Sequence, residues 1–544
     1  MKESVQNIIK QSGDLFSKKI TLDSLWQEIA ENFYPQRADF TTVRYLGKEL
    51  ADNLTTSYPI LAHRDLSNAI STYLRPRSQQ WFKISVFDED SLDNDGREWL
   101  EWATKRMKRF MYSKESGFVR ATKEGDADFA AFGQTAIYVE ADYNNINLNV
   151  QCCHLRDLAF CEDETGNISA RYRKKKWTNR QLVNLFGNKV HDKIREKVDK
   201  EPYNEVNCLH VVMKAKDYTS DVKYKQPYVS LWIDVDNQHI MEEVGSWTKK
   251  YSIPRWQTVS GSQYAYSPSV VAALPDARLI QAVSLTLLEA GEKAVNPPLV
   301  AVQDVFREDT ISSASASINW MDSAYDERTG APIRELFNTD KSALSFGINL
   351  REETRQMIAE AFYLNKLNLP LAGPAMTATE VTQRIQEYIR NALPLFEPME
   401  IEYNADLCEL IFETLLRAGA FESRQLPESL AGQEIKFVFD NPLVQAEGKE
   451  KMQRLLETKA ALAEAAALDP AVANMLDVKE ALRDALNGNG TPAKWLRSEK
   501  EVADIENQMQ QKQQAQEMIA ALGQGAQVAE QVGLAGQAIN AAGI

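Results

Sequence analysis

Cysteine and histidine side chains are the first candidates for chemistry in this sequence, because they bind metals and act as nucleophiles or bases. Cys152, Cys153 and His154 are consecutive and Cys161 follows them, but the sequence has no Cys-x-x-Cys pair. Successive residues of a strand point to opposite faces, so Cys152 and Cys153 would not share one metal ion. We therefore predict buried thiols and no metal site. The five cysteines are unevenly spaced, which argues against a disulfide framework and fits a reducing cytosol.

The acidic stretch at residues 88–96 has the sequence DEDSLDNDG and resembles a calcium-binding loop. When Gly96 is aligned with the invariant glycine of such a loop, Ser91 falls on the first ligand position and Trp102 on the last, so ligands are missing at both positions. An acidic cap at the N-terminus of a helix over residues 97–110 is the simpler interpretation.

Motifs that bind phosphates or activate nucleophiles are absent from the sequence. It contains no GxxxxGK[ST], GxGxxG or GxSxG, and its five histidines form no HExxH pair. We therefore predict no cofactor and no enzymatic activity.

A basic run is the remaining candidate for a binding site. It comprises Arg171, Arg173, Lys174, Lys175, Lys176 and Arg180 and continues to Lys200. Tyr172 and Trp177 interrupt the charges, a pattern that is compatible with nucleic-acid contact. Two alternatives remain open: a solvated strand whose charges protect a sheet edge, or contact with an acidic neighbouring subunit.

Composition limits the possible classes of protein. The chain has 544 residues, 44% of them hydrophobic and 26% charged, which is typical of a globular protein with several domains. Its formal net charge of −15 argues against a protein that coats nucleic acid. The N-terminus lacks the apolar core of a secretory signal, and no run approaches 18 uncharged apolar residues, so no membrane partner is expected.

The N-terminal half is predicted to be helical first and then rich in strands. Leu22, Trp26 and Ile29 fall at helical spacing, and residues 81–86 form an isolated strand pattern. Further strands are predicted at residues 135–140, 148–152, 206–213 and 228–235, with a helix from Asn179 between them.

A helical series is predicted from residue 268 onward. Pro275 suits the start of a helix with its apolar stripe at Leu279, Val283 and Leu287, which the prolines at 297–298 end. Residues 299–347 read as irregular, and a second helix follows with Leu350, Met357 and Phe362 on one face. The next stretch, residues 366–376 (KLNLPLAGPAM), is predicted to be a loop.

A third helix is predicted to begin with a capping box formed by Thr377 and Glu380. Pro394 and Pro398 should kink or break it before a helix resumes at residues 407–416. Alanine-rich helices follow at 449–468 and 478–486. The last residues, 507–544, contain ten glutamines and nine alanines, which indicates a weak assembly helix or a disordered tail.

Several stretches resemble the head-to-tail connecting proteins, or portal proteins, of podoviruses, which are short-tailed bacteriophages. Residues 261–268 (GSQYAYSP), 273–276 (ALPD) and 295–298 (VNPP) match one family pattern. Residues 75–84 (RPRSQQWFKI), 129–140 (FAAFGQTAIYVE) and 376–381 (MTATEV) agree in order, and together the matches span roughly residues 20–450. The family usually has glycine where Ala265 stands, which leaves the turn geometry open.

The resemblance implies a mixed α/β, predominantly helical portal fold and a homo-dodecameric ring of about twelve copies around a channel. The implied parts are a wing at 1–267, a first stem helix at 268–298, a clip at 299–348, a second stem helix at 349–365, a tunnel loop at 366–376, a kinked helix returning to the wing at 377–448, a crown at 449–497 and a tail at 498–544.

The resemblance also implies partners and a location. The partners would be double-stranded DNA passing through the channel, the terminase large subunit, tail adaptor proteins, and scaffold, major capsid and internal core proteins. The protein would lie at the portal vertex of the virion, after assembly in the host cytoplasm.

Channel contacts are expected from Lys366, Asn368 and Leu369 of the implied tunnel loop. In a ring, one lysine near the axis becomes a circle of like charges. The plainer interpretation of Lys366 is a solvated lysine that stabilises the carbonyl groups at a helix end.

The acidic net charge suits a channel for DNA better than a protein that binds DNA tightly. Each phosphate neutralised by lysine or arginine strengthens salt-dependent binding and would slow moving DNA. Two other classes stay open: another structural virion protein, such as a tail adaptor or internal scaffold, and an enzyme without a recognisable motif within residues 129–265. A native mass would separate them, since a closed ring supports the portal and a monomer or dimer favours the enzyme.

Overall fold

The computed structural model describes two compact units. Unit 1 comprises Met1–Ser78 and Phe110–Ala418, and unit 2 comprises Gln79–Arg109 and Gly419–Ile544. The described residues are 3–43, 45, 47, 49–77, 79–88, 92–142, 146–219, 225–295, 299–301, 333–335, 341–367, 394, 396–439, 452–463, 481–482, 485–486, 491, 495, 502, 504–512 and 514. The fold is mixed α/β and predominantly helical, as the sequence predicted.

The largest sheet of unit 1 is antiparallel, with the strand order β4-β5-β6-β7-β8. Its strands are β4 (Leu158–Glu162), β5 (Ile168–Thr178), β6 (Glu205–Lys214), β7 (Tyr228–Asp234) and β8 (His239–Ser246). Helix α1 (Val5–Lys18) covers one face through Ile8 and Phe16. On the other face, α6 (Asn179–Phe186) and α7 (Asp192–Lys197) contribute Leu182 and Ile194 to a second apolar cluster.

A smaller sheet with the strand order β3-β2-β9 lies beside the same unit's helices. It consists of β2 (Ile137–Asp142), β3 (Asn147–Cys152) and β9 (Tyr251–Ser252), and its helical neighbours are α5 (Phe118–Phe132) and α13 (Asp406–Arg417). Helix α5 packs in turn against α2 (Ile20–Phe33) and α3 (Tyr58–Leu74). The buried His210 of β6 links the two sheets: its Nδ1 shares a 2.5 Å hydrogen bond with Tyr251 Oη, and its Nε2 lies 2.9 Å from Ser230 Oγ. Because both ring nitrogens have partners, this buried histidine is satisfied as a structural residue.

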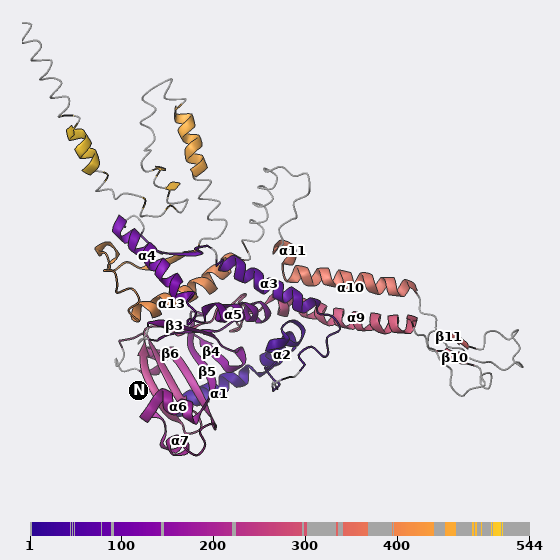
Figure 1. Cartoon of the computed structure of the whole chain (residues 1–544). Helices are drawn as coiled ribbons and strands as arrows, with labels where there is room; N and C mark the ends of the chain where they lie inside the picture. The colour runs from indigo at the N-terminus through magenta and orange to yellow at the C-terminus, as the bar shows by residue number, and fades with distance from the viewer. Residues whose placement is uncertain are drawn as a thin grey trace, which may run out of the picture. The chain divides into compact units, whose positions relative to one another are not determined.

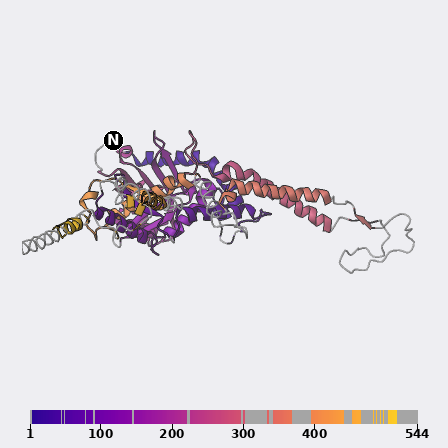
Figure 2. The ribbon, with the colours of Figure 1, turned by 90° about the horizontal axis from the view of Figure 1, so that it is seen from above.

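A helical hairpin continues unit 1. A π-helical turn, Ser269–Ala273, leads into α9 (Leu274–Val295), which pairs with α10 (Lys341–Ala361) as Figures 1 and 2 show. Gly347 permits the close packing, since a Cβ there would lie 2.7 Å from Leu287 Cδ2. Short strands β10 (Leu299–Ala301) and β11 (Ile333–Glu335) pair inside the stretch predicted to be irregular.

The second helix of the hairpin begins at Lys341 and not at 349 as predicted. In the sequence, Leu344, Phe346 and Ile348 alternate with polar or small residues. That period of two is typical of a strand, so the first turns of α10 carry no helical stripe that would have marked them.

One helix among the described residues, Val271–Val295, is long and apolar enough by length and composition to cross a membrane. Asp276 and Arg278 interrupt its apolar run, so the sequence has no uncharged segment of this length here. Leu274, Ala277 and Ile280 are buried in unit 1. The inner part of this helix therefore belongs to the protein core.

The helix that follows the two prolines is irregular. Pro394 and Pro398 both lie in helical conformation, and a π-helix, Glu400–Ala405, joins them to α13 (Asp406–Arg417). A proline lacks the N–H that would continue the ladder, so a wider turn next to it is physically reasonable. The helix predicted at residues 407–416 coincides with α13.

Unit 2 contains α4 (Asn94–Met111) and an antiparallel pair of strands, β1 (Phe82–Val86) and β12 (Ile435–Phe439). Asp93 caps α4: its Oδ1 accepts the Gly96 N–H at 2.7 Å and the Ser429 hydroxyl at 2.6 Å. The predicted acidic helix cap is thus confirmed. Residues 452–463 are helical, within the alanine-rich helix predicted at 449–468.

Candidate assembly surface and channel residues

The base of the α9–α10 hairpin is tied to the N-terminal segment by polar contacts. Gln281 of α9 accepts the backbone N–H groups of Thr55 at 2.8 Å and Thr56 at 3.0 Å through its Oε1. One turn earlier, Arg278 makes a two-pronged ion pair with Glu28 of α2, with distances of 2.6 and 2.7 Å. A two-pronged pair fixes orientation as well as distance. The hairpin therefore leaves unit 1 in a defined direction.

Beyond that base, α9 exposes apolar side chains on more than one side. Leu279, Leu285 and Leu288 are 40%, 48% and 61% exposed. By contrast, Ile280 is buried, and Leu287 faces Gly347 of α10. At about 100° per residue, Leu279 lies to one side of the α10-facing stripe and Leu288 to the other. Exposed apolar side chains in such numbers are typical of an interaction surface.

The C-terminal end of α10, where the helix returns to unit 1, is anchored in the core and leads to Lys366. The Phe362 ring packs on Phe33 with centroids 5.3 Å apart, and Tyr363 adopts a left-handed conformation with φ of 57°. Short helix α11 (Leu364–Leu367) follows, and the Lys366 N–H donates to the Tyr363 carbonyl at 2.9 Å. Lys366 is thus exposed in a helical turn and not in the loop predicted for it, because α11 begins directly after Tyr363.

The other predicted residues of this region cannot be placed. Asn368 and Leu369 of the expected tunnel loop, and Thr377 and Glu380 of the expected capping box, lie outside the described residues. So do most of the expected clip and the stretch from residue 515 to the end of the chain. For these segments the sequence predictions stay predictions.

The basic run is divided by the strand that carries it. On β5, Arg171, Arg173 and Lys175 point to the face that meets the smaller sheet, whereas Lys174 and Lys176 point to the α1 side. Lys174 Nζ lies 3.7 Å from the centroid of the Phe16 ring of α1. The five side chains therefore do not form one basic surface. Up to Arg173, β5 pairs with both β4 and β6, whereas residues 174–178 pair with β6 alone. Lys174 and Lys176 are exposed on that one-sided stretch, which fits the edge-protection interpretation.

Burial of the inward-facing cations is the feature that sequence reasoning missed. Arg171 is buried, and its Nε and Nη1 have no hydrogen-bond partner among the described residues. Burial lowers its pKa to about 10. Arg173 lies over the Tyr138 ring and Lys175 over the Trp177 ring, with cation-to-centroid distances of 5.9 and 4.6 Å. Of the two aromatic residues between the charges, Trp177 thus contacts one of the protein's own cations, whereas the Tyr172 hydroxyl donates to Gln11 Oε1 at 2.8 Å.

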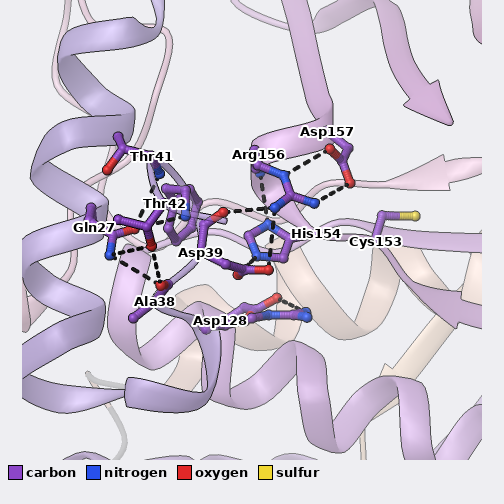
Figure 3. A network of polar contacts seen from close by, with 12 residues as sticks. Gln27, Ala38, Asp39, Thr41, Thr42, Asp128, Cys153, His154, Arg156 and Asp157 are labelled. Carbon is purple, nitrogen blue, oxygen red and sulfur yellow. Dashed lines mark hydrogen bonds and ion pairs between the residues drawn. The ribbon is translucent and has the colours of Figure 1, made fainter. Parts of the chain in front are cut away.

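A polar network fixes the segment after α2 (Figure 3). Asp39 accepts from Arg156 Nη1 at 3.3 Å and lies 2.6 Å from His154 Nε2. Nearby, the buried Lys19 donates to the carbonyl groups of Leu155 at 2.5 Å and Leu158 at 2.8 Å. Burial lowers the pKa of Lys19 to about 8. The sequence marks Lys19 only by its i,i+4 spacing to Asp23, with which it forms a 3.4 Å ion pair, because its backbone partners lie far along the chain.

Residues from separate sequence stretches meet at α5. Arg75 forms a buried ion pair with Asp126 of α5 and donates to Asn404 Oδ1 at 2.8 Å. Gly133, at the end of α5, has φ of 75°, and a Cβ on it would lie 2.5 Å from the carbonyl carbon of Tyr266. Two of the stretches that carry the family resemblance, 129–140 and 261–268, are therefore packing partners within unit 1.

The five cysteines are free thiols, as predicted. Cys153, Cys208 and Cys408 are buried, and the other two are half-buried. Burial raises the pKa of Cys152 well above its ordinary value, with the neighbouring Asp128 carboxylate adding to the effect. Within the described residues, no three His, Cys, Asp or Glu side chains are grouped to hold a metal ion.

Comparison with known families gives the decisive observation. Residues 6–496 match the model of the bacteriophage head to tail connecting protein family. The chain belongs to this family. The resemblance inferred from the sequence is confirmed, and the family is one of structural connecting proteins and not of enzymes. Ala265, where glycine was expected, has no positive φ, so alanine is tolerated at that turn.

Two relatives are similar over nearly the whole length. The probable portal protein of Bordetella phage BPP-1 is 25% identical over 542 residues, covering 97% of this chain and 95% of its own. The portal protein of Salmonella phage epsilon15 is 22% identical over 534 residues, covering 96% and 94%.

Solved structures with partial similarity come from gene transfer agent particles. A chain of the virion of the native particle aligns with a TM-score of 0.36 and 9% identity, covering 75% of this chain and 86% of that one. A chain from the neck of the empty particle aligns with a TM-score of 0.37 and 10% identity, covering 76% and 89%.

Proposed function

We propose that this protein is the portal subunit of a bacteriophage. About twelve copies would close into a ring at one capsid vertex and form the conduit for genome packaging and ejection. Membership of the connecting-protein family and the two portal relatives support this role. The ring would form in the host cytoplasm and remain in the virion.

The observation that carries the proposal is the exposure of α9 on opposed sides. Leu279 on one side and Leu288 on the other are apolar and exposed, although α9 already pairs with α10. A ring is built by heterologous contacts, in which two different surfaces of each chain meet. A helix with an apolar residue on each side suits that arrangement, and burial of each leucine would contribute roughly 1–2 kcal/mol.

A conduit also requires that its wall bind DNA weakly, so that the duplex can slide through it. A ring of about twelve chains, each with a net charge of −15, would be strongly acidic overall. Few cations at the axis would then contact the duplex. Lys366 is our candidate cation, and Asn368 and Leu369 are candidate neutral contacts beside it. ATP hydrolysis would fall to a separate partner, the terminase large subunit, with tail adaptor proteins replacing it later. Scaffold, major capsid and internal core proteins complete the expected partners.

Charge substitutions on α9 test the assembly directly. We expect Leu285→Glu with Leu288→Glu to give single chains with an unchanged thermal melt, because a buried carboxylate pair would oppose ring closure. The matched control is Leu185→Glu, at a residue of α6 that is 60% exposed. It should assemble normally. Rings from the α9 double variant that form as readily as wild-type rings would contradict the proposed interface.

A further inference from the structure

A segment of unit 1, residues 41–54, is clamped at its start by a glutamine side chain; we name this segment the strap. The Gln27 Oε1 accepts the N–H groups of Phe40 at 2.8 Å and Thr41 at 3.2 Å, and its Nε2 donates to the Ala38 carbonyl at 3.1 Å. Figure 3 shows this carboxamide facing the turn that it holds. The clamp fixes where the strap leaves α2.

The other end of the strap is clamped in the same way by α9. Gln281 Oε1 accepts the N–H groups of Thr55 and Thr56, and its Nε2 donates to the Thr56 carbonyl at 3.0 Å. The Thr55 hydroxyl adds a 2.9 Å bond to the Gln281 backbone carbonyl. An amide side chain can accept and donate at once, so each glutamine satisfies several backbone groups of the chain that passes it. Both ends of the strap are thereby fixed to unit 1.

Between the two clamps, described residues of the strap expose apolar side chains. Val43 and Tyr45 are 68% and 69% exposed, and Leu50 is also exposed. Their apolar surface is stabilising only when it is removed from water. Fixed ends reduce the conformational entropy that docking would cost. Fixed ends with exposed apolar side chains between them are features of a docking element.

The position of the strap on α9 indicates its partner. Gln281 and Leu279 are two positions apart, so they lie about 200° apart around the helix, on nearly opposite sides. The strap therefore leaves α9 on one side, and the exposed Leu279 lies on the other. A head-to-tail ring brings two different sides of neighbouring copies together. Both sides carry exposed apolar side chains: Val43 and Tyr45 of the strap on one, and Leu279 of α9 on the other.

We propose that the strap of one copy docks on the Leu279 side of α9 in the next copy, where Val43 and Tyr45 cover that leucine. The inference rests on the proposed ring and specifies which surfaces meet in it. Gln27 and Gln281 act as positioning residues, because they hold the strap next to the part of α9 that would face the neighbouring copy.

Cross-linking between singly substituted chains tests this contact. Full-length Tyr45→Cys and Leu279→Cys are purified separately, mixed as single chains, assembled and treated with a short bismaleimide. Each chain carries one new thiol, so a linked dimer that needs both variants reports a contact between copies. We expect that dimer from the mixture only, and neither variant alone, nor the wild type with its native cysteines, should give it.

The outcomes separate this inference from the proposed ring. Assembly of the wild type without a mixed dimer would overturn the strap contact and leave the ring standing, and a dimer from Tyr45→Cys alone would overturn it as well. A wild type that never assembles would overturn both. As a second measurement, Val43→Asp with Tyr45→Asp should raise the concentration needed for half-assembly about tenfold or more. Val244→Asp, at an exposed residue of β8, is the control that should leave it unchanged.

Discussion

Phe362, in the turn that follows α10, packs its ring against Phe33 of α2 with the centroids 5.3 Å apart. Both rings are fully buried. Because Lys366 follows Phe362 by four residues, across the left-handed Tyr363, the position of the candidate channel lysine depends on this contact. The candidate channel lysine is thus supported by the core of unit 1, at the point where α10 returns to it.

Phe362→Ala is expected to destabilise unit 1 by about 3–5 kcal/mol, because it removes a buried ring and leaves a cavity. Denaturant unfolding of the single chain measures the loss. Phe346, on α10 and 70% exposed, supplies the control. Phe346→Ala should change the stability of the single chain by less than about 0.5 kcal/mol. Equal effects of the two substitutions would contradict the described packing.

Lys366→Glu is expected to impair DNA packaging while rings still form. In the proposed ring it would turn a circle of positive charges into a circle of negative charges near the moving phosphates. A complementation assay that counts filled heads measures the effect, and Lys366→Arg, which keeps the charge, should package normally. Normal packaging by Lys366→Glu would remove this residue from the channel.

Gly133→Ala is expected to destabilise the protein by more than about 3 kcal/mol, because a Cβ would meet the Tyr266 backbone and the φ of 75° disfavours L side chains. Gly166 also has a positive φ, of 79°, but a Cβ there would meet nothing within 4 Å. Gly166→Ala should therefore cost only about 1–2 kcal/mol of backbone strain. Thermal melts of the two variants, compared with the wild type, decide the point; similar melts would show that the α5 contact is not tight.

Lys19 should make stability depend on pH in the alkaline range. Burial lowers its pKa to about 8 in the folded protein, against about 10.5 when exposed. Between these values the unfolded chain binds more protons, so this group's contribution to stability rises with pH, by up to about 1.4 kcal/mol per pH unit. The difference in unfolding free energy between the wild type and Lys19→Met, measured from about pH 8 to 10, should show that slope. A difference that does not change with pH would contradict the burial of a titrating Lys19.

Elements with a strong local pattern could be predicted from the sequence. The strands at 206–213 and 228–235 correspond to β6 and β7, since alternating or continuous apolar residues specify a buried strand. The stripe through Leu279, Val283 and Leu287 predicted α9. The start of α10 was missed, because its apolar residues alternate with a period of two and carry no helical stripe.

Contacts between distant residues could not be predicted in this way. Arg171 reads as a solvated cation in the sequence, and only the interior position of β5 shows that it is buried. Gln27 and Gln281 bind backbone groups. Every residue carries such groups, so no pattern of residue types in the sequence indicates these contacts. Family resemblance supplied the role, and tertiary structure supplied the surfaces that would carry it.

The mass and shape of the purified assembly test the portal role most directly. We predict that native mass measurement gives a closed ring of about twelve 61.5 kDa chains, and that images of the same sample show an axial hole. A stable monomer or dimer, or a particle without a hole, would contradict the proposed conduit.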